Sequence, residues 1–424
     1  MSEAYQNHLP QHPTKPAQSR TVDVLVIGGG IAGKACALGL AQLGLQTLEI
    51  APDLGVTVPT PQGPQWGQRI YAFSPSTQKL LAHLQIWDAL DHSRLQVVRD
   101  MRIYGDRGEK HDQLHLSAFE AGTPQLAWIG ESNLIEHTLD QASRFQNKLE
   151  RLSDVVKKIE VGDKVSTVHL KSGLSIHAQL VIAADGANSP IRSAIGVTAS
   201  EESYEQNAVV ANWHCTYPHL ETAFQWFLRG GDIVAMLPLP NQQVSMVWST
   251  SPEHAAELLS LTPSQWSDRF MSIANGAIPK QLGELTLNST PAAFPLRKIR
   301  ATRFIGPAEN PQVALIGDAA HVMHPLAGQG LNLGLRDVFV LLNIIGKRES
   351  FRPLNDLKLL RRYERQRQGD TSALLWVTDK LKKLFSGNSS TEKQLRNWGL
   401  GLVNKSHFIK QRLIERALGE IHFD

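Results

Sequence analysis

The sequence predicts an α/β protein: a nucleotide-binding domain with an inserted antiparallel sheet, followed by a helical C-terminal region. Near the N-terminus, an apolar run leads into a glycine-rich turn and a helix-like stretch. Between about 200 and 294, short β-branched or aromatic segments alternate with turn signals. Beyond Gly346, apolar residues recur at helical spacing. With 424 residues, the chain exceeds what one hydrophobic core usually serves, so we expect several domains.

The first element is a βαβ unit within VDVLVIGGGIAGKACALGLAQLGLQTLEIAPD, residues 22–53. The apolar run Val22–Ile27 suits a parallel strand buried on both faces. A helix over Ala35–Leu45 and a strand over Gln46–Ile50 complete the unit. The GxGxxG pattern between them allows a tight turn, close approach of a pyrophosphate and close helix–strand packing. We therefore predict a Rossmann-like dinucleotide site with contacts from Gly28, Gly30, Ile31, Ala32 and Gly33.

The ligand of the adenosine ribose stays open at this point. An acidic residue at the end of the second strand is the usual ribose ligand. Here Glu49 precedes the last strand residue, Ala51 occupies the strand end and Asp53 follows a proline. Glu49, Asp53 or neither residue could serve.

Two further strand ends carry polar turns. In LVIAADGANSPIR, residues 180–192, a strand ends before Asp185-Gly186. In ALIGDAAHVMHPLAGQGLNLG, residues 314–334, a strand ends in Gly317-Asp318 and is followed by histidines, a proline and glycines. Either turn alone is common in loops that bind nothing. A backbone that closely approaches a flat, anionic cofactor, however, needs such glycines and polar residues.

Taken in order, GxGxxG, the DG turn and the GD turn with HPxxGQGxN resemble the class A flavoprotein aromatic hydroxylases, relatives of para-hydroxybenzoate hydroxylase. GDAAHVMHPLAGQGLNLGLRD, with residues 68–90 and 294–300, most resembles the ubiquinone-biosynthesis branch. The likeness runs from about Val22 to about Leu418. It implies FAD as cofactor, with NAD(P)H and molecular oxygen as co-substrates. The implied reaction is hydroxylation of a polyprenylated phenol by a C4a-hydroperoxyflavin.

The resemblance also implies roles for individual residues. Asp318 would bind ribityl hydroxyls, Arg69 would lie over the flavin and its phosphates, and Asp185-Gly186 would contact nucleotide. The segment Gly328–Gly330 would lead into a helix over Leu331–Ile345. The amides of Leu331 and Asn332 would stabilise anionic reduced flavin. Pro325 and Gly330 would shape the catalytic flavin edge, with no acid–base residue assigned.

His321 and His324 fit either a pocket-shaping role or proton transfer, and no third partner is evident in the sequence. Glu131-Ser132 departs from the Glu-Asn that relatives often have there. We expect no metal site, because CxxC is absent and no third ligand lies at a recognisable spacing.

The segment between about 200 and 294 is the expected substrate domain. One wall of its pocket could come from Trp226, Met236, Leu237 and Trp248. About half of such residues are expected to be ordinary core. No run of arginines faces a carboxylate, and an aromatic, Met-lined cavity suits a hydrophobic prenylated phenol. The expected boundaries are a disordered tail 1–20, an FAD-binding domain 21–200 plus 296–345, a substrate domain 201–295 and a helical region 346–424.

Composition limits the location and the partners. The two cysteines rule out a disulfide framework and favour a reducing cytoplasm. Residues 358–418 contain 14 Lys/Arg and 5 Asp/Glu, a net of +9 in a chain of net charge +3. This basic region suggests either a solvated helical face or peripheral contact with the inner membrane surface. Nothing resembles a nucleic-acid-reading motif.

Three other functions remain open. A hydroxylase of a small soluble phenol would bind a carboxylate through an arginine. A reductase of prenyl chains would share the fold without oxygen chemistry. A non-catalytic FAD-binding scaffold of other quinone-biosynthesis proteins would hold FAD without substrate-stimulated NAD(P)H oxidation.

Overall fold

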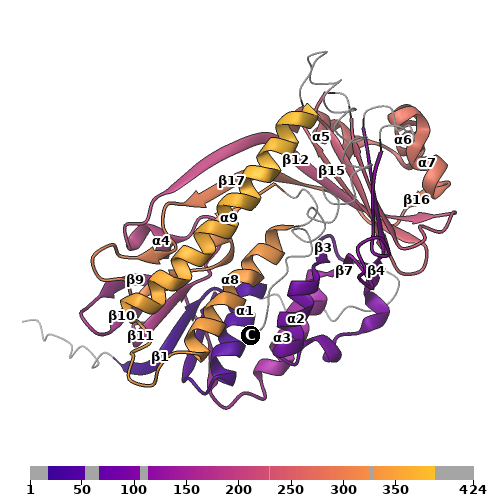
Figure 1. Cartoon of the computed structure of the whole chain (residues 1–424). Helices are drawn as coiled ribbons and strands as arrows, with labels where there is room; N and C mark the ends of the chain where they lie inside the picture. Colours follow the sequence, from indigo (N-terminus) through magenta and orange to yellow (C-terminus); the bar gives the residue numbers. More distant parts are fainter. Residues whose placement is uncertain (1–17, 53–65, 106–112, 229, 325–328, 387–424) are drawn as a thin grey trace, which may run out of the picture.

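A computed structural model describes residues 18–52, 66–105, 113–228, 230–324 and 329–386 (Figure 1). Three sheets organise this part of the chain, with strand orders β18-β19-β11-β1-β2-β8, β20-β17-β12-β15-β14-β13-β5-β6 and β3-β7-β4. The first carries the glycine-rich turn, and the second is the antiparallel sheet that the sequence predicted as an insertion. The predicted α/β class with an inserted sheet is confirmed.

The first sheet has a parallel centre. Its strands are β1 (Ser19–Ile27), β2 (Thr47–Ala51), β8 (Leu149–Ser153), β11 (Ser175–Ala183) and β19 (Val313–Leu315), with β9 (Val156–Val161), β10 (Ser166–Leu170) and β18 (Ile305–Gly306) at its margins. Helix α1 (Ile31–Gln42) packs against α3 (Ser132–Ser143) and α8 (Gln329–Gly346). It begins before the predicted Ala35, because the chain enters the helix directly from its N-cap Gly30.

The N-terminal boundary needs a correction. Ser19 and Arg20, assigned to the disordered tail, belong to β1 and pair with Ser175 and Ile176 of β11. Residues 1–17 lie outside the described part.

The second sheet is larger than the predicted substrate domain. It contains β12 (Ala199–Cys215), β13 (Thr222–Phe227), β14 (Ile233–Leu239), β15 (Gln243–Thr250), β16 (Leu285–Leu287), β17 (Ala292–Ala301) and β20 (His321–Val322). Strands β5 (Asp100–Tyr104) and β6 (Gln113–Ser117) also join it, because β5 pairs in parallel with β13. The boundaries at 200 and 295 therefore cut through this sheet, and β17 crosses the second one unbroken (Figure 1).

Each large sheet has its own core. Aliphatic side chains of the first sheet pack against α1 and α8. In the second, Trp213, Trp226 and Trp248 pack with Trp266 and Phe270 of α6 (Pro263–Ser272). Helices α5 (Pro252–Ser260) and α7 (Ala277–Leu282) extend this core. The two clusters have no residue in common, as expected for two units that bury their apolar surface separately.

The remaining elements connect these units. A small sheet of β3 (Ile70–Phe73), β4 (Gln96–Val98) and β7 (Ala127–Glu131) precedes α3, and α2 (Pro75–His83) packs on α8. Helix α9 (Leu357–Ser386) packs along α8 and includes the predicted helix over 374–385 (Figure 1). Among the described helices, none is long and apolar enough to cross a membrane. Both cysteines are free and buried.

Candidate active site

The glycine-rich loop is shaped by two close backbone contacts. Gly28 has a φ of +125°, and a Cβ there would lie 2.1 Å from the carbonyl oxygen of Ala184. A Cβ on Gly33 would lie 2.0 Å from the carbonyl oxygen of Gly28. At Gly30, by contrast, a Cβ would meet nothing within 4 Å. The loop therefore packs tightly on its protein side and is open at Gly30, as a pyrophosphate cradle requires.

The DG turn lies beside this loop, because Ala184 contacts Gly28. The Asp185 carboxylate accepts hydrogen bonds from Ser189 Oγ at 2.5 Å and from the Ile191 amide at 3.0 Å. It thereby fixes the start of the short helix α4 (Pro190–Ala194). Burial raises the pKa of Asp185, against these hydrogen bonds. The structure thus gives this carboxylate a structural role, and nucleotide contact by Asp185 and Gly186 stays a prediction.

The GD turn meets the same loop from the other side. Gly317 has a φ of +59°, and its Cβ would lie 3.4 Å from the Ala32 Cβ. Burial raises the pKa of Asp318, while His321, Arg297 and Arg69 act in the opposite direction. Arg69 is therefore close enough to influence Asp318, so residues far apart in the sequence meet at one place.

A buried ionic network holds the GD turn. Asp337 Oδ2 accepts from the Gly317 amide at 2.8 Å and lies 2.7 Å from His321 Nε2, while Arg367 Nε donates to Oδ1 at 2.6 Å. Asp337, His321 and Arg367 are all buried. His321 thus has the partner that the sequence did not reveal. Sequence reasoning missed Asp337 and Arg367, since only the fold brings α8 and α9 to this turn.

The start of α8 is where the predicted flavin-edge segment enters the helix. Gly330 is open, since a Cβ there would meet nothing within 4 Å, and Leu331 packs partly against the first core. The Asn332 side chain donates to the Ala72 carbonyl at 2.8 Å and accepts from the Ser74 amide and the Thr77 hydroxyl. It ties α8 to β3 and α2. Pro325 and Gly328 lie outside the described residues, so their predicted roles stay predictions.

The segment leading to Arg69 is clamped by buried polar groups. Glu131 accepts from Arg94 Nε at 2.7 Å and from the Gly67 amide, and Arg94 lies over the Trp66 ring at 4.4 Å. Asn212 of β12 donates to the carbonyls of Trp66 and Gly67. The Ser132 amide donates to the Arg69 carbonyl at 3.0 Å. Glu131-Ser132 therefore holds the Arg69 segment, although it departs from the family's Glu-Asn.

The predicted substrate residues separate onto two faces of the second sheet. Trp226, Met236 and Trp248 are fully buried in the core shared with α6, and their role in a pocket wall stays a prediction. Side chains alternate along a strand, so the neighbouring Leu237 lies on the opposite face. There it packs with Trp66, Val98 and Ile129, next to the small sheet.

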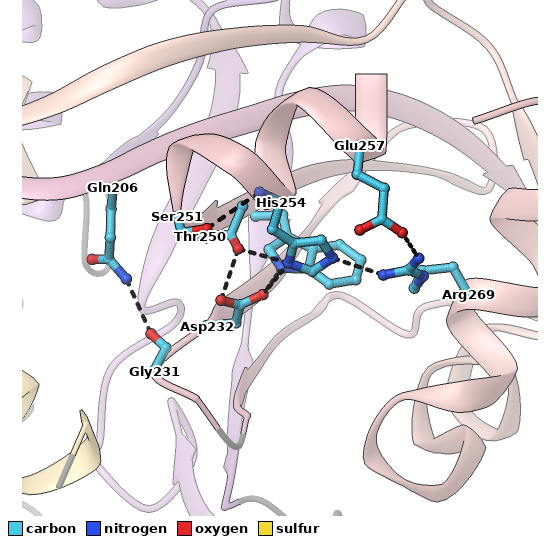
Figure 2. A network of polar contacts seen from close by, with 9 residues as sticks. Gln206, Gly231, Asp232, Thr250, Ser251, His254, Glu257 and Arg269 are labelled. Carbon is cyan, nitrogen blue, oxygen red and sulfur yellow. Dashed lines mark hydrogen bonds and ion pairs between the residues drawn. The ribbon is translucent and has the colours of Figure 1, made fainter. Parts of the chain in front are cut away.

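A polar network connects the second sheet with helices α5 and α6 (Figure 2). Asp232 accepts from Trp248 Nε1 and Thr250 Oγ1, each at 2.8 Å, and from His254 Nδ1 at 2.9 Å. Arg269 donates to His254 Nε2 at 2.7 Å. His254 Nδ1 also lies 2.8 Å from Thr250 Oγ1, so both ring nitrogens of this histidine are engaged within the cluster.

The network extends toward the GD motif through one side chain. Gln206 donates to the Gly231 carbonyl at 3.1 Å and, through its other amide atom, lies 3.4 Å from His324 Nε2. The buried His324 ring also packs edge-on against Tyr204, with centroids 4.9 Å apart. His324 thus packs against β12 of the second sheet, and these contacts indicate a structural role.

A family model described as "FAD binding domain" matches residues 21–375, which include the glycine-rich loop, the DG turn and the GD turn. The chain belongs to this family. The 3-demethoxyubiquinol 3-hydroxylase of Escherichia coli (strain K12) is 30% identical over 405 residues, covering 95% of this chain and 99% of that protein. The human mitochondrial ubiquinone biosynthesis monooxygenase COQ6 is 31% identical, covering 93% of this chain and 92% of its own length.

Solved structures agree with the fold of this FAD-binding family. The p-nitrophenol 4-monooxygenase PnpA from Pseudomonas putida DLL-E4 superposes with a TM-score of 0.72 at 19% identity, covering 95% of this chain and all of that one. HpxO of Klebsiella pneumoniae, crystallised with FAD and uric acid, has a TM-score of 0.70 at 20% identity, covering 96% of this chain and 98% of its own.

FAD is the cofactor of this family member, and the enzyme is an FAD-dependent aromatic-ring monooxygenase. The site fits the cofactor on independent grounds. The loop leaves space over Gly30 that a Cβ would fill, the GD turn that carries Asp318 lies against Ala32, and the charge of Arg69 acts on Asp318. The predicted cofactor and reaction class are therefore confirmed.

Proposed function

We propose that this monooxygenase hydroxylates the ring of a polyprenylated phenol in ubiquinone biosynthesis, with NAD(P)H as the source of electrons. The proposal rests on the convergence of the Gly28–Gly33 loop, the Gly317-Asp318 turn and the start of α8 in one site. The relatives named 3-demethoxyubiquinol 3-hydroxylase and ubiquinone biosynthesis monooxygenase match this chain over nearly their whole length.

The chain's own residues bind and orient the cofactor. The Gly28–Gly33 loop presents helix-terminal amides to the pyrophosphate, and Asp318 accepts from ribityl hydroxyls. Arg69, held through its backbone by Ser132, supplies positive charge beside Asp318. Amides of Leu331 and Asn332 at the start of α8 favour negative charge on the ring edge. When bound, FAD supplies the redox chemistry with NAD(P)H and oxygen.

The face of the second sheet that carries Leu237 supports a hydrophobic substrate. Its cluster consists of apolar side chains from β4, β5, β7, β13 and β14 together with Trp66 (Trp66, Val98, Met101, Ala127, Ile129, Ala223, Leu237 and Leu239, with Ile70 and Ala72 of β3). Apolar contact binds and desolvates a prenylated ring. We place the substrate against this cluster.

The same proposal includes peripheral contact with the inner membrane surface, where a prenylated substrate resides. In the described part of α9, Arg361, Arg362 and Arg365 are exposed. Such arginines favour anionic headgroups. The rest of the basic region, from residue 387, lies outside the described residues. Contact with other quinone-biosynthesis proteins is part of this proposal.

Quinone lipids from a strain lacking this gene test the proposal by mass spectrometry. We expect a prenylated phenol missing one ring hydroxyl to accumulate, and its structure identifies the ring position. The wild-type gene and the Asp163→Ala variant, which changes an exposed acid, should restore the quinone. Asp318→Ala should not, and it should purify largely without FAD. A protein that resides at the membrane sediments with the membrane fraction at low salt and is released at high salt.

Other outcomes favour the alternatives. Normal quinone levels, with oxygen consumption on small phenols by the purified enzyme, would show a hydroxylase of soluble phenols. If the deletion strain lacks quinone and the Asp318→Ala gene restores it, the protein would be a scaffold rather than an enzyme. Accumulation of a quinone with unsaturated prenyl units and no missing hydroxyl would show a prenyl reductase.

A further inference from the structure

The strand end that normally carries the ribose acid has no carboxylate here. Strand β2 ends at Ala51, next to the glycine-rich loop. A Cβ placed on Gly29 would come within 2.7 Å of the Ala51 Cβ, so the loop lies directly on this residue. Dinucleotide sites of this fold use an acidic side chain at this place for the ribose hydroxyls. The strand end itself therefore offers no carboxylate to the adenosine ribose, and Asp53, the other acid left open by the sequence, lies outside the described residues.

A buried ion pair lies under the same part of the loop. Glu49 is two residues before Ala51 and so shares its face of β2. Its Oε1 lies 3.6 Å from the Cβ position of Gly29, and its side chain is 1% exposed. Arg151 of β8 is its direct neighbour in register. Arg151 Nε lies 3.0 Å from Glu49 Oε2, and Nη2 donates to Oε1 at 3.3 Å.

A second carboxylate holds the other side of the guanidinium. Arg151 Nη1 donates to Asp140 Oδ1 at 2.7 Å, and Lys34 of α1 forms an ion pair with Asp140 at 2.8 Å. The side chain of Lys34 is buried, whereas that of Arg151 is 36% exposed. Arg151 is thus the most exposed member of this group, and both acids fix the plane of its guanidinium. The guanidinium has five N–H donors, and some of them are used by neither Glu49 nor Asp140 and can bind a ligand.

We propose that Arg151 binds the adenosine end of FAD, donating to the ribose hydroxyl oxygens in place of the missing strand-end acid. Glu49 and Asp140 are positioning residues that orient the guanidinium. Burial raises the pKa of Glu49, and Arg151 and Lys34 oppose this shift. Glu49 is too buried to contact the ribose itself. The proposal uses the FAD binding of this family and is independent of the phenol that the enzyme hydroxylates.

The test compares FAD with 5′-ADP, which carries only the adenosine and pyrophosphate end. Both affinities are measured on the apoprotein, FAD by flavin fluorescence and 5′-ADP by competition with FAD. Loss of one charge-assisted hydrogen bond should make Arg151→Gln bind both ligands about tenfold more weakly. Arg144→Gln, which changes an exposed arginine at the end of α3, should bind both as the wild type does.

Asp318→Ala is the reference for the other end of the cofactor. It should weaken FAD while leaving 5′-ADP unchanged, because 5′-ADP has no ribityl chain. Arg151→Gln binding 5′-ADP with wild-type affinity would overturn the proposal, whatever happens to FAD.

Arg151→Gln leaves Glu49 without its main counter-charge and could therefore destabilise the protein. A second variant separates this effect from the loss of ligand binding. Glu49→Gln/Arg151→Gln removes both charges and should restore the melting temperature of the apoprotein. It should still bind 5′-ADP about tenfold more weakly than wild type. If this folded double variant bound 5′-ADP with wild-type affinity, Arg151 would be only a structural partner of Glu49.

Discussion

At the residue scale, one buried carboxylate holds the turn that carries Asp318. The fully buried Asp337 carboxylate accepts hydrogen bonds from the Gly317 amide, His321 and Arg367. Burial alone would raise the pKa of Asp337, but the charges and hydrogen bonds of His321 and Arg367 outweigh it and leave that pKa below its ordinary value. Asp337 therefore contributes stability as a carboxylate, and it does so at the cofactor site.

Asp337→Asn should lower the free energy of unfolding of the apoprotein by about 3 kcal/mol near neutral pH, because Arg367 loses a buried counter-charge. A lowered folded pKa gives stability that is fully present above the unfolded value of ~3.9 and is lost as pH falls through the folded value. The difference between wild type and variant should thus shrink as the pH falls below ~3.9, as measured by urea unfolding.

Asp163→Asn, an exposed acid in the β9–β10 turn, is the control and should differ little from wild type at either pH. A gap between wild type and Asp337→Asn that stays constant with pH would contradict the ionic assignment of Asp337.

At the element scale, the β1–α1 turn uses its glycines for two different reasons. Gly33 is required by the protein itself, since its Cβ would collide with the backbone of Gly28. Gly30 has an extended backbone conformation with open space around it, so the free protein would accept a side chain there. Only the cofactor would then meet the added methyl group.

Gly30→Ala should therefore keep the unfolding free energy of the apoprotein within about 1 kcal/mol of wild type, the range of helix N-cap changes. It should nevertheless weaken FAD binding, because the methyl group occupies the pyrophosphate space. Gly33→Ala should reduce both quantities. Thermal unfolding and FAD titration of the two apoproteins measure this, and unchanged FAD affinity in Gly30→Ala would place the pyrophosphate elsewhere.

At the scale of the whole molecule, the second sheet serves two neighbours at once. One face builds the domain's own tryptophan-rich core with α5, α6 and α7, and the other meets the small sheet beside the FAD-binding unit. Adjacent residues of β14 lie on opposite faces. Met236 is fully buried in the tryptophan-rich core, and Leu237 is half-buried in the cluster next to the small sheet. If the substrate lies where we propose, stability and substrate contact can therefore be changed independently.

Met236→Ala should destabilise the protein by about 2–5 kcal/mol through the cavity it leaves, with KM for the prenylated phenol close to wild type. Leu237→Ala should raise KM several-fold and lower stability less, because its side chain is only half-buried. Thermal unfolding and steady-state kinetics of this neighbouring pair make the comparison. A raised KM in Met236→Ala with none in Leu237→Ala would put the substrate on the other face of the sheet.

The sequence alone determined the βαβ unit, the three nucleotide motifs and the cofactor class. These depend on local features: a glycine forced by a positive φ or a close backbone, an apolar run ending in a polar turn, and their order along the chain. The same local reasoning placed a helix over Leu331–Ile345, and α8 spans Gln329–Gly346.

Only the tertiary structure decided which distant groups share a site. Asp337 and Arg367 reach the GD turn because α9 packs on α8, and Arg151 meets Glu49 because β8 lies next to β2. Likewise, strand alternation sends Trp226, Met236 and Trp248 into a core, but only the packing of α6 shows which face is the core. Ion pairs and sheet faces depend on strand order and helix docking, which no short stretch of sequence encodes.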